Sequence, residues 1–277
     1  MGKVISFLNM KGGVLKTTLC RELAYFLEGR QKKILVIDVD PQSNCTQSFF
    51  EKYGVETVDE KGKKKDGITS IQNMYDVKLL DIRRESVILK LTDFLSIIPG
   101  DLSTVFMERD PSSKNEQRLY TLIKNWELRE EFDYIFIDCP PTYSTYTVSA
   151  LLCSDFYIAP TQPDLYSILG LSLLNEVVNH FITDDQAALM ADRDLKCLGI
   201  ILTKVMEDKR TNDIITGLKT FAEEKGLYIF TQQVKYQNKL ATSKLSTFFK
   251  DRRDASLLDT IENLADDFER RIKEFES

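Results

Sequence analysis

The sequence predicts an α/β fold in which a doubly wound, mostly parallel twisted sheet is flanked by helices. Six short apolar runs rich in branched residues have the pattern of strands buried on both faces, at 3–8, 33–38, 94–98, 133–138, 155–159 and 198–203. Helix-like stretches separate these runs. A strand–helix–strand order implies parallel strands joined by right-handed crossovers, and its repetition gives an open sheet.

The helices and connections are predicted from spacing and polarity. Between the first two strands, residues 16–30 have apolar side chains at helical spacing. The segment 56–67 is polar and lysine-rich, which favours a solvated loop over a nucleic-acid contact. Residues 108–117 are expected to form an exposed connection, and 254–277 a charged amphipathic C-terminal helix. We see no internal repeat and no sharp boundary, so 1–277 is expected to be one domain.

The composition excludes several classes of protein. The net charge is −6, so contact with nucleic acid would need a local basic patch. The five cysteines form no C-x-x-C pair, which argues against a zinc site or a disulfide framework. His180 is the only histidine, so a Ser-His-Asp triad is nearly excluded. The sequence has neither a signal-peptide pattern nor an apolar run of about 18 residues, which predicts a cytoplasmic protein without a membrane span.

The first predicted strand leads through a glycine-containing turn, residues 9–15, directly into a helix. Such a turn can point successive backbone N–H groups at a phosphate, next to the positive end of the helix. Lys16 would then reach the β- and γ-phosphates, and the Thr17 hydroxyl would coordinate Mg²⁺. The general pattern G-x-x-x-x-G-K-[ST] is not satisfied, because Met10 and Leu15 occupy its glycine positions. An ordinary strand–helix turn is the structural alternative.

Acidic residues end two of the predicted strands. Asp38 and Asp40 lie on the same side of the second strand at its carboxyl end, where two like charges are costly unless a cation joins them. Asp138 ends the apolar run 134–137, as in a Walker B motif. In an open α/β sheet these ends face the ligand crevice. Capping aspartates at strand–loop junctions are the alternative for either site alone.

These motifs carry a resemblance to a known family. Residues 11–18, KGGVLKTT, match seven of the eight positions of KGGVGKTT, the deviant Walker A motif of the ParA/MinD class. The D-x-D-P-Q segment from Asp38 and the D-x-P-P segment from Asp138 resemble two more signatures of the ParA family of partitioning proteins, in the family's order. Residues 158–171 resemble the stretch that frames the nucleotide. The resemblance implies a P-loop ATPase that uses ATP and Mg²⁺.

The resemblance also implies roles for individual residues. Lys11 corresponds to the signature lysine that reaches across a nucleotide-sandwich dimer to the partner's phosphates. Asp40 would position or activate the attacking water, Asp38 would help to organise the Mg²⁺ shell, and Asp138 would hold Mg²⁺ through its water shell. The expected catalytic residues are Lys11, Lys16 and Asp40, and the expected metal site is Thr17, Asp38 and Asp138. The expected nucleotide contacts are Lys11, Gly12, Gly13, Val14, Leu15, Lys16, Thr17 and Thr18.

Leu15 departs from the family pattern, which has glycine there. Glycine permits backbone angles and a close phosphate approach that a branched side chain resists. If φ is positive at this position, leucine costs about 1 kcal/mol or more. We expect nucleotide binding to survive, with the rate of hydrolysis less secure.

A basic segment, residues 226–253, is the candidate DNA contact. No acidic residue occurs from 226 to 250. The resemblance implies DNA binding without sequence preference, through basic residues on the C-terminal side of an ATP-bound dimer. The candidate residues are Lys235, Lys239, Lys244, Lys250, Arg252 and Arg253. For each lysine alone, a solvated surface position is the alternative. Tyr236, Phe248 and Phe249 could stack on bases or pack.

The resemblance as a whole implies a slow, Mg²⁺-dependent ATPase of plasmid or chromosome partitioning. ATP would close a homodimer that holds nucleoid DNA, and a ParB-like centromere-binding partner would stimulate hydrolysis and release. One alternative is a nucleotide-dependent regulator or adaptor in which Leu15 impairs hydrolysis. The other is a MinD-like membrane-associated ATPase, which the acidic C-terminal sequence disfavours because MinD proteins end in a basic amphipathic helix.

Overall fold

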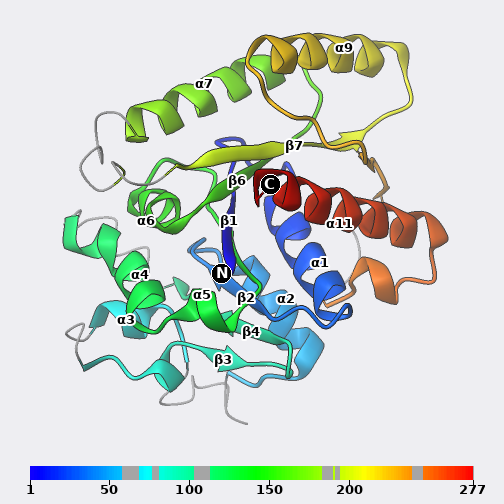
Figure 1. The fold of residues 1–277 in the computed structure, drawn as a ribbon. Helices are drawn as coiled ribbons and strands as arrows, with labels where there is room; N and C mark the ends of the chain where they lie inside the picture. Colours follow the sequence, from blue (N-terminus) through cyan, green and yellow to red (C-terminus); the bar gives the residue numbers. More distant parts are fainter. Residues whose placement is uncertain are drawn as a thin grey trace.

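The computed structural model describes residues 1–57, 69–76, 81–102, 113–182, 190, 194–238 and 246–276. Within these residues the strands form one sheet of eight in the order β3-β4-β2-β5-β1-β6-β7-β8 (Figure 1). Its strands are β1 (Lys3–Phe7), β2 (Ile34–Asp38), β3 (Leu89–Lys90), β4 (Leu95–Ile98), β5 (Tyr134–Asp138), β6 (Phe156–Thr161), β7 (Lys196–Val205) and β8 (Val234–Lys235). All pairs are parallel except β3 with β4.

Helices cover both faces of the sheet. One face carries α1 (Lys16–Glu28), α2 (Asn44–Tyr53) and α11 (Ala255–Glu276). The other carries α3 (Gln72–Asp76), α4 (Ser113–Asn125), α5 (Leu128–Glu131), α6 (Thr145–Cys153), α7 (Ser167–His180) and α9 (Lys209–Glu224). Two short 3₁₀ turns, η2 (Arg84–Ser86) and η5 (Phe249–Asp251), complete the named elements. The predicted α/β fold class is confirmed.

The six predicted strands are all present, and the predicted helix over 16–30 is α1. Its face of Leu19, Leu23 and Leu27 is fully buried against the sheet. The expectation for 108–117 was wrong over its second half, because residues 113–117 belong to α4. The apolar face of this helix, with Leu119, Leu122 and Ile123, is buried and outweighs its polar first turn. Residues 58–67 and 108–112 of the predicted loops lie outside the described residues.

The centre of the sheet contains the point where the winding direction reverses. The chain passes from β1 to β2 over β5, and from β5 to β6 over β1. At the carboxyl ends of these strands, Asp38 of β2 and Phe7 of β1 are each in register with Asp138 of β5. Ligands of open α/β sheets bind at such a switch point. The fold therefore brings the ends of the predicted motifs to one place.

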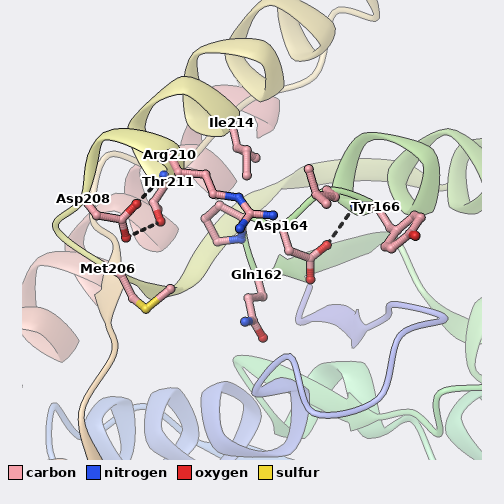
Figure 2. A pocket seen from close by; sticks show the side chains of 10 residues that line it. Gln162, Asp164, Tyr166, Met206, Asp208, Arg210, Thr211 and Ile214 are labelled. Atoms are coloured by element: carbon pink, nitrogen blue, oxygen red, sulfur yellow. Dashed lines mark hydrogen bonds between the residues drawn. The ribbon is translucent and has the colours of Figure 1, made fainter.

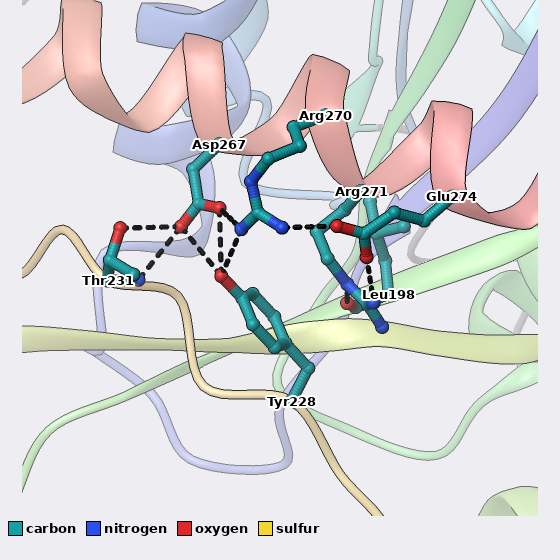
Figure 3. A network of polar contacts seen from close by, with 7 residues as sticks. All are labelled: Leu198, Tyr228, Thr231, Asp267, Arg270, Arg271 and Glu274. Carbon is teal, nitrogen blue, oxygen red and sulfur yellow. Dashed lines mark hydrogen bonds and ion pairs between the residues drawn. The ribbon is translucent and has the colours of Figure 1, made fainter.

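A polar network fixes α11 to the connection between β7 and β8 (Figure 3). The buried carboxylate of Asp267 accepts hydrogen bonds from Thr231 N and Oγ1, at 2.8 and 2.9 Å, and from the Tyr228 hydroxyl at 2.8 Å. The Arg270 guanidinium donates to the same carboxylate. Burial alone would raise the pKa of Asp267, but these hydrogen bonds outweigh it and hold the pKa below its usual range. No helix in the described part of the chain is long and apolar enough to cross a membrane.

Replacing Asp267 by asparagine is expected to lower the free energy of unfolding at neutral pH by about 1.5–3 kcal/mol, because charge-assisted hydrogen bonds are lost. Since the folded-state pKa is depressed, this contribution is present above the usual carboxyl pKa of about 4 and is lost as the pH falls through the folded-state value. Urea unfolding of wild type and Asp267→Asn from pH 7 to pH 3 measures the difference, which should shrink in acid. Asp259→Asn, on the exposed face of α11, is the control and should change stability by less than about 0.5 kcal/mol. A difference that is independent of pH would contradict this account.

Candidate functional site

The turn between β1 and α1 is closed by its own side chains. The Asn9 amide donates to the Pro160 carbonyl at 2.7 Å, and its oxygen accepts the Lys11 N–H at 2.9 Å. Lys16, the first residue of α1, is 6% exposed, and its ammonium donates to the carbonyls of Asn9 at 3.0 Å and Lys11 at 3.1 Å. The lysine therefore points back into the turn, with its charge in the space that the turn surrounds.

Burial has the largest effect on the pKa of Lys16. Removal from water lowers the pKa of its ammonium, and the nearby Asp138, Cys139 and Asp40 act in the opposite direction. A cation held in this way has lost most of its hydration by water. An anion such as a phosphate group would restore the balance.

Leu15 has the backbone conformation for which glycine is suited, with φ 68° and ψ 27° at the N-cap of α1. Gly13, two residues earlier, also has a positive φ of 73°. A left-handed conformation costs a non-glycine residue roughly 1–2 kcal/mol. The half-buried Leu15 side chain packs against the apolar cluster under α1, which offsets part of that cost.

Asp38 is fully buried at the end of β2 and is held by α2. One of its oxygens accepts hydrogen bonds from Thr46 N at 2.8 Å and Thr46 Oγ1 at 2.7 Å, and the other accepts Asp40 N at 3.2 Å. The Thr46 hydroxyl accepts Gly100 N at 2.7 Å, and a Cβ at Gly100 would lie only 3.0 Å from the Asp38 carboxyl carbon. Burial raises the pKa of Asp38 to about 7, against the effect of the Thr46 hydrogen bonds.

Asp138 lies beside Asp38 and is also fully buried, but neither of its carboxylate oxygens has a hydrogen-bond partner within the described part of the chain. Its pKa is well above the usual range because of burial and the neighbouring Asp38 charge, which the Lys16 ammonium offsets only in part. A buried carboxylate without partners calls for a proton, a water or a cation. The protein thus presents Thr17, Asp38 and Asp138 together as hard oxygen donors.

This donor set fits Mg²⁺ better than a cation that needs a full protein cage. Among the described residues, no group of three or more histidine, cysteine or carboxylate side chains is arranged to enclose a metal ion. Mg²⁺ keeps several waters and is usually bound by one or two carboxylates together with substrate phosphates. Asp40 lies at the rim of the site, 9% exposed, and its carboxylate accepts Gln42 N at 2.9 Å.

Lys11 has a partner that sequence reasoning did not identify. Its exposed ammonium forms an ion pair with Asp164 in the connection between β6 and α7. Asp164 also accepts Tyr166 N at 3.0 Å, which fixes the start of α7. The only sequence signal is that Asp164 lies within the 158–171 stretch.

A cavity of about 530 Å³ opens beside this ion pair, between the starts of α7 and α9 (Figure 2). Asp164 and Tyr166 line it on one side, and Met206, Arg210 and Ile214 on the other. The exposed Arg210 side chain extends across it toward Asp164 (Figure 2). The site therefore continues from the turn between β1 and α1 into a space with both apolar and charged walls.

The basic residues predicted to contact DNA do not all lie exposed and unpaired on one surface. Lys250 and Arg253 are exposed, whereas Arg252 is half-buried and donates to the Thr247 carbonyl at 3.2 Å. Lys235 forms an ion pair of 2.6 Å with Glu207, so the absence of acidic residues from the local sequence does not hold in three dimensions. Lys239 and Lys244 lie outside the described residues.

The aromatic residues of this segment divide between two roles. Phe248 and Phe249 are buried and pack, while Tyr236 is half exposed. Phe249 N donates to the buried carboxylate of Glu22 in α1 at 2.7 Å. The segment that carries Lys250 and Arg253 is thus attached to α1, the helix that begins with Lys16.

Comparison with known proteins gives matches over most of the chain. A family model described as an AAA domain matches residues 2–191. The sporulation initiation inhibitor protein Soj of Bacillus subtilis is 34% identical over 235 residues, which covers 81% of this chain and 82% of Soj. The chromosome partitioning protein ParA of Myxococcus xanthus is 33% identical over 216 residues, which covers 76% of this chain and 68% of that protein.

Solved structures show the same fold. A plasmid partition protein of Borrelia burgdorferi bound to AMPPNP superposes with a TM-score of 0.74 at 22% identity, covering 98% of this chain and 99% of that one. An ATP complex of a Cyanothece McdA variant also superposes with a TM-score of 0.74 at 22% identity, and the match covers 96% of each chain.

The backbone at Leu15 makes a prediction about two small substitutions. Because φ is positive there, Leu15→Gly should be more stable than Leu15→Ala by about 1 kcal/mol, as both lose the packing and only glycine loses the strain. Urea unfolding without nucleotide measures the two free energies. At Lys219, on the exposed face of helix α9, the same pair should have the opposite order by about 1 kcal/mol. If alanine were the more stable residue at both positions, the left-handed conformation of Leu15 would be wrong.

Proposed function

Because the chain belongs to the ParA/Soj family of partitioning ATPases, we propose that it hydrolyses ATP with Mg²⁺ and that its nucleotide state controls its binding to DNA during plasmid or chromosome segregation. The observation that carries this proposal is the convergence of Lys16, Asp38 and the unpartnered Asp138 at one end of the central strands. A buried cation suits the negative triphosphate, and two buried carboxylates suit its metal ion. The site therefore fits the pair better than it would fit an anion or a metal ion alone.

Each residue of the site has a distinct task in this proposal. Backbone N–H groups of residues 11–18 and the Lys16 ammonium bind the phosphate oxygens. Thr17, Asp38 and Asp138 hold Mg²⁺, which neutralises charge on the β- and γ-phosphates when it is bound. Asp40, at the more open rim, orients the attacking water.

Lys11 acts between subunits in this proposal. In the single chain it pairs with Asp164, and in an ATP-bound homodimer it transfers to the triphosphate held by the other subunit. The exposure of this ion pair supports the exchange, because exposed pairs are worth only about 0–1 kcal/mol.

DNA would be bound through the exposed cations of the basic segment, with Lys250 and Arg253 as the best-placed candidates. Contacts to phosphate need positive charge but no base-reading groups, in keeping with binding that ignores sequence. A ParB-like centromere-binding protein would stimulate hydrolysis and release. We place the protein on the nucleoid in the cytoplasm and treat 1–277 as one ATPase unit, with α11 packed on α1.

A second candidate is a nucleotide-dependent regulator with impaired hydrolysis. The left-handed Leu15 favours it, because a side chain at this point of the turn can hinder the approach of the phosphates. Turnover in the presence of DNA and the partner protein separates the two functions.

Lys16→Ala is expected to reduce ATP turnover by at least about 100-fold, since it removes the cation that stabilises charge on the transferred phosphate.

Asp40→Ala should reduce turnover by about 10²–10⁴-fold while ATP affinity stays within a few-fold of wild type. Phosphate release and binding of a fluorescent ATP analogue provide the two measurements. Lys33→Ala, an exposed lysine before β2, is the control and should match wild type. Unchanged turnover in Lys16→Ala would overturn the assignment of the site.

Replacing both Lys250 and Arg253 by glutamine should weaken DNA binding in the ATP state. Each phosphate contact contributes about −0.9 to the slope of log Kobs against log salt, so the loss of two contacts should make this slope less steep by about 2. Fluorescence anisotropy with duplex DNA at several salt concentrations gives this slope. Lys219→Gln on α9 is the matched control and should leave the slope unchanged. If the double variant keeps the wild-type slope, DNA is bound elsewhere.

A further inference from the structure

Residues 248–251 are clasped by the two helices that begin at the nucleotide site. α1 starts with Lys16 at the phosphate turn, and α2 starts at Asn44 and carries Thr46, which holds Asp38. The exposed cations Lys250 and Arg253 lie within and just beyond the clasped residues. One short segment therefore contacts both helices and also carries the predicted DNA contacts.

The aromatic part of this clasp is Phe248, which is fully buried. Its ring lies 4.6 Å from that of Tyr25 in α1 and 5.4 Å from that of Phe49 in α2. The Arg21 guanidinium of α1 lies over the same ring at 5.0 Å, and the Lys52 ammonium of α2 at 6.0 Å. Both helices thus supply a ring and a cation to one phenylalanine.

Polar contacts repeat this arrangement on either side of Lys250. Phe249 N donates to Glu22 of α1 at 2.7 Å. Asp251 accepts the Tyr25 hydroxyl of α1 at 3.0 Å and pairs with Lys52 of α2 at 2.7 Å. The position of this segment is therefore set by α1 and α2 jointly.

We propose that Phe248 and Glu22 couple the nucleotide site to the basic segment, so that a change in the spacing of α1 and α2 on ATP binding repositions Lys250 and Arg253. This inference rests on the proposed function, because it concerns regulation of that same site. A triphosphate with its metal draws on Lys16 and Thr17 of α1 and on Asp38, which α2 holds through Thr46. Packed interfaces change between discrete arrangements and do not deform continuously, so a ring wedged between two helices responds to their relative position. Phe248 and Glu22 act as positioning residues that touch neither ATP nor DNA.

The test measures coupling and not activity. The dissociation constant for duplex DNA is determined with and without ATPγS, and that for ATPγS with and without DNA, in the full-length chain. By linkage the two ratios must agree, and wild type is expected to show at least about tenfold coupling. In Phe248→Leu and Glu22→Gln the ratio should fall below about threefold, while the affinity for ATPγS without DNA stays within about twofold of wild type. Phe275→Leu, a more exposed phenylalanine of α11, should keep the wild-type ratio.

Each outcome separates the coupling from the proposed function. A wild-type ratio of one would reject ATP-controlled DNA binding, and with it the proposed function. A wild-type ratio near ten that persists in both variants would overturn the coupling alone. The coupling would also be overturned if each variant lost as much affinity for ATPγS without DNA as it lost in the coupling ratio, because such a loss indicates damage to the nucleotide site. If Phe248→Leu fails to fold, Glu22→Gln decides, since it keeps the shape of the side chain but removes the negative charge that accepts from Phe249 N and pairs with Arg21 at 3.2 Å.

Discussion

The register between β2 and β5 places two buried carboxylates, Asp38 and Asp138, side by side at the centre of the sheet. Their mutual repulsion and their removal from water are unfavourable unless a proton or a cation joins them. The nearby parts of the structure manage this charge. Thr46 and the N-terminal end of α2 stabilise Asp38, and the Lys16 ammonium lies close to Asp138. In the proposed function, bound magnesium and nucleotide would meet the remaining need of Asp138, which would tie the stability of this region to both ligands.

The turn between β1 and α1 is already ordered in the chain without a ligand. Lys16 occupies the turn by donating to two of its carbonyls, and Asn9 fixes the turn to β6. Such preparation lowers the reorganisation that a phosphate would otherwise have to drive. Leu15 is the exception, because it keeps a strained backbone with only partial compensation from packing. Strain of this kind is common where a chain binds ligands closely.

The sequence patterns predicted the central strands, because runs of neighbouring apolar residues determine them. The six central strands are apolar runs ending in turn or acidic residues, and their burial on both faces made them recognisable. The edge strands β3 and β8 contain two residues each and carry no periodicity to detect. The first turn of α4 was missed because its residues are polar. Ion pairs that depend on folding, such as Lys11 with Asp164 and Lys235 with Glu207, join residues far apart in the sequence, and no local pattern predicts that these residues pair.

The ion pair of Lys11 has a consequence for assembly. An exposed pair contributes at most about 1 kcal/mol, so it opposes the departure of the lysine only weakly. Because the pair stabilises only the free chain, whatever it contributes is given up when the lysine leaves for another anion. In the two-fold symmetric dimer of the proposed function this small cost would arise once in each subunit. Asp164 would therefore set a low threshold that a triphosphate must exceed before it draws Lys11 across the interface.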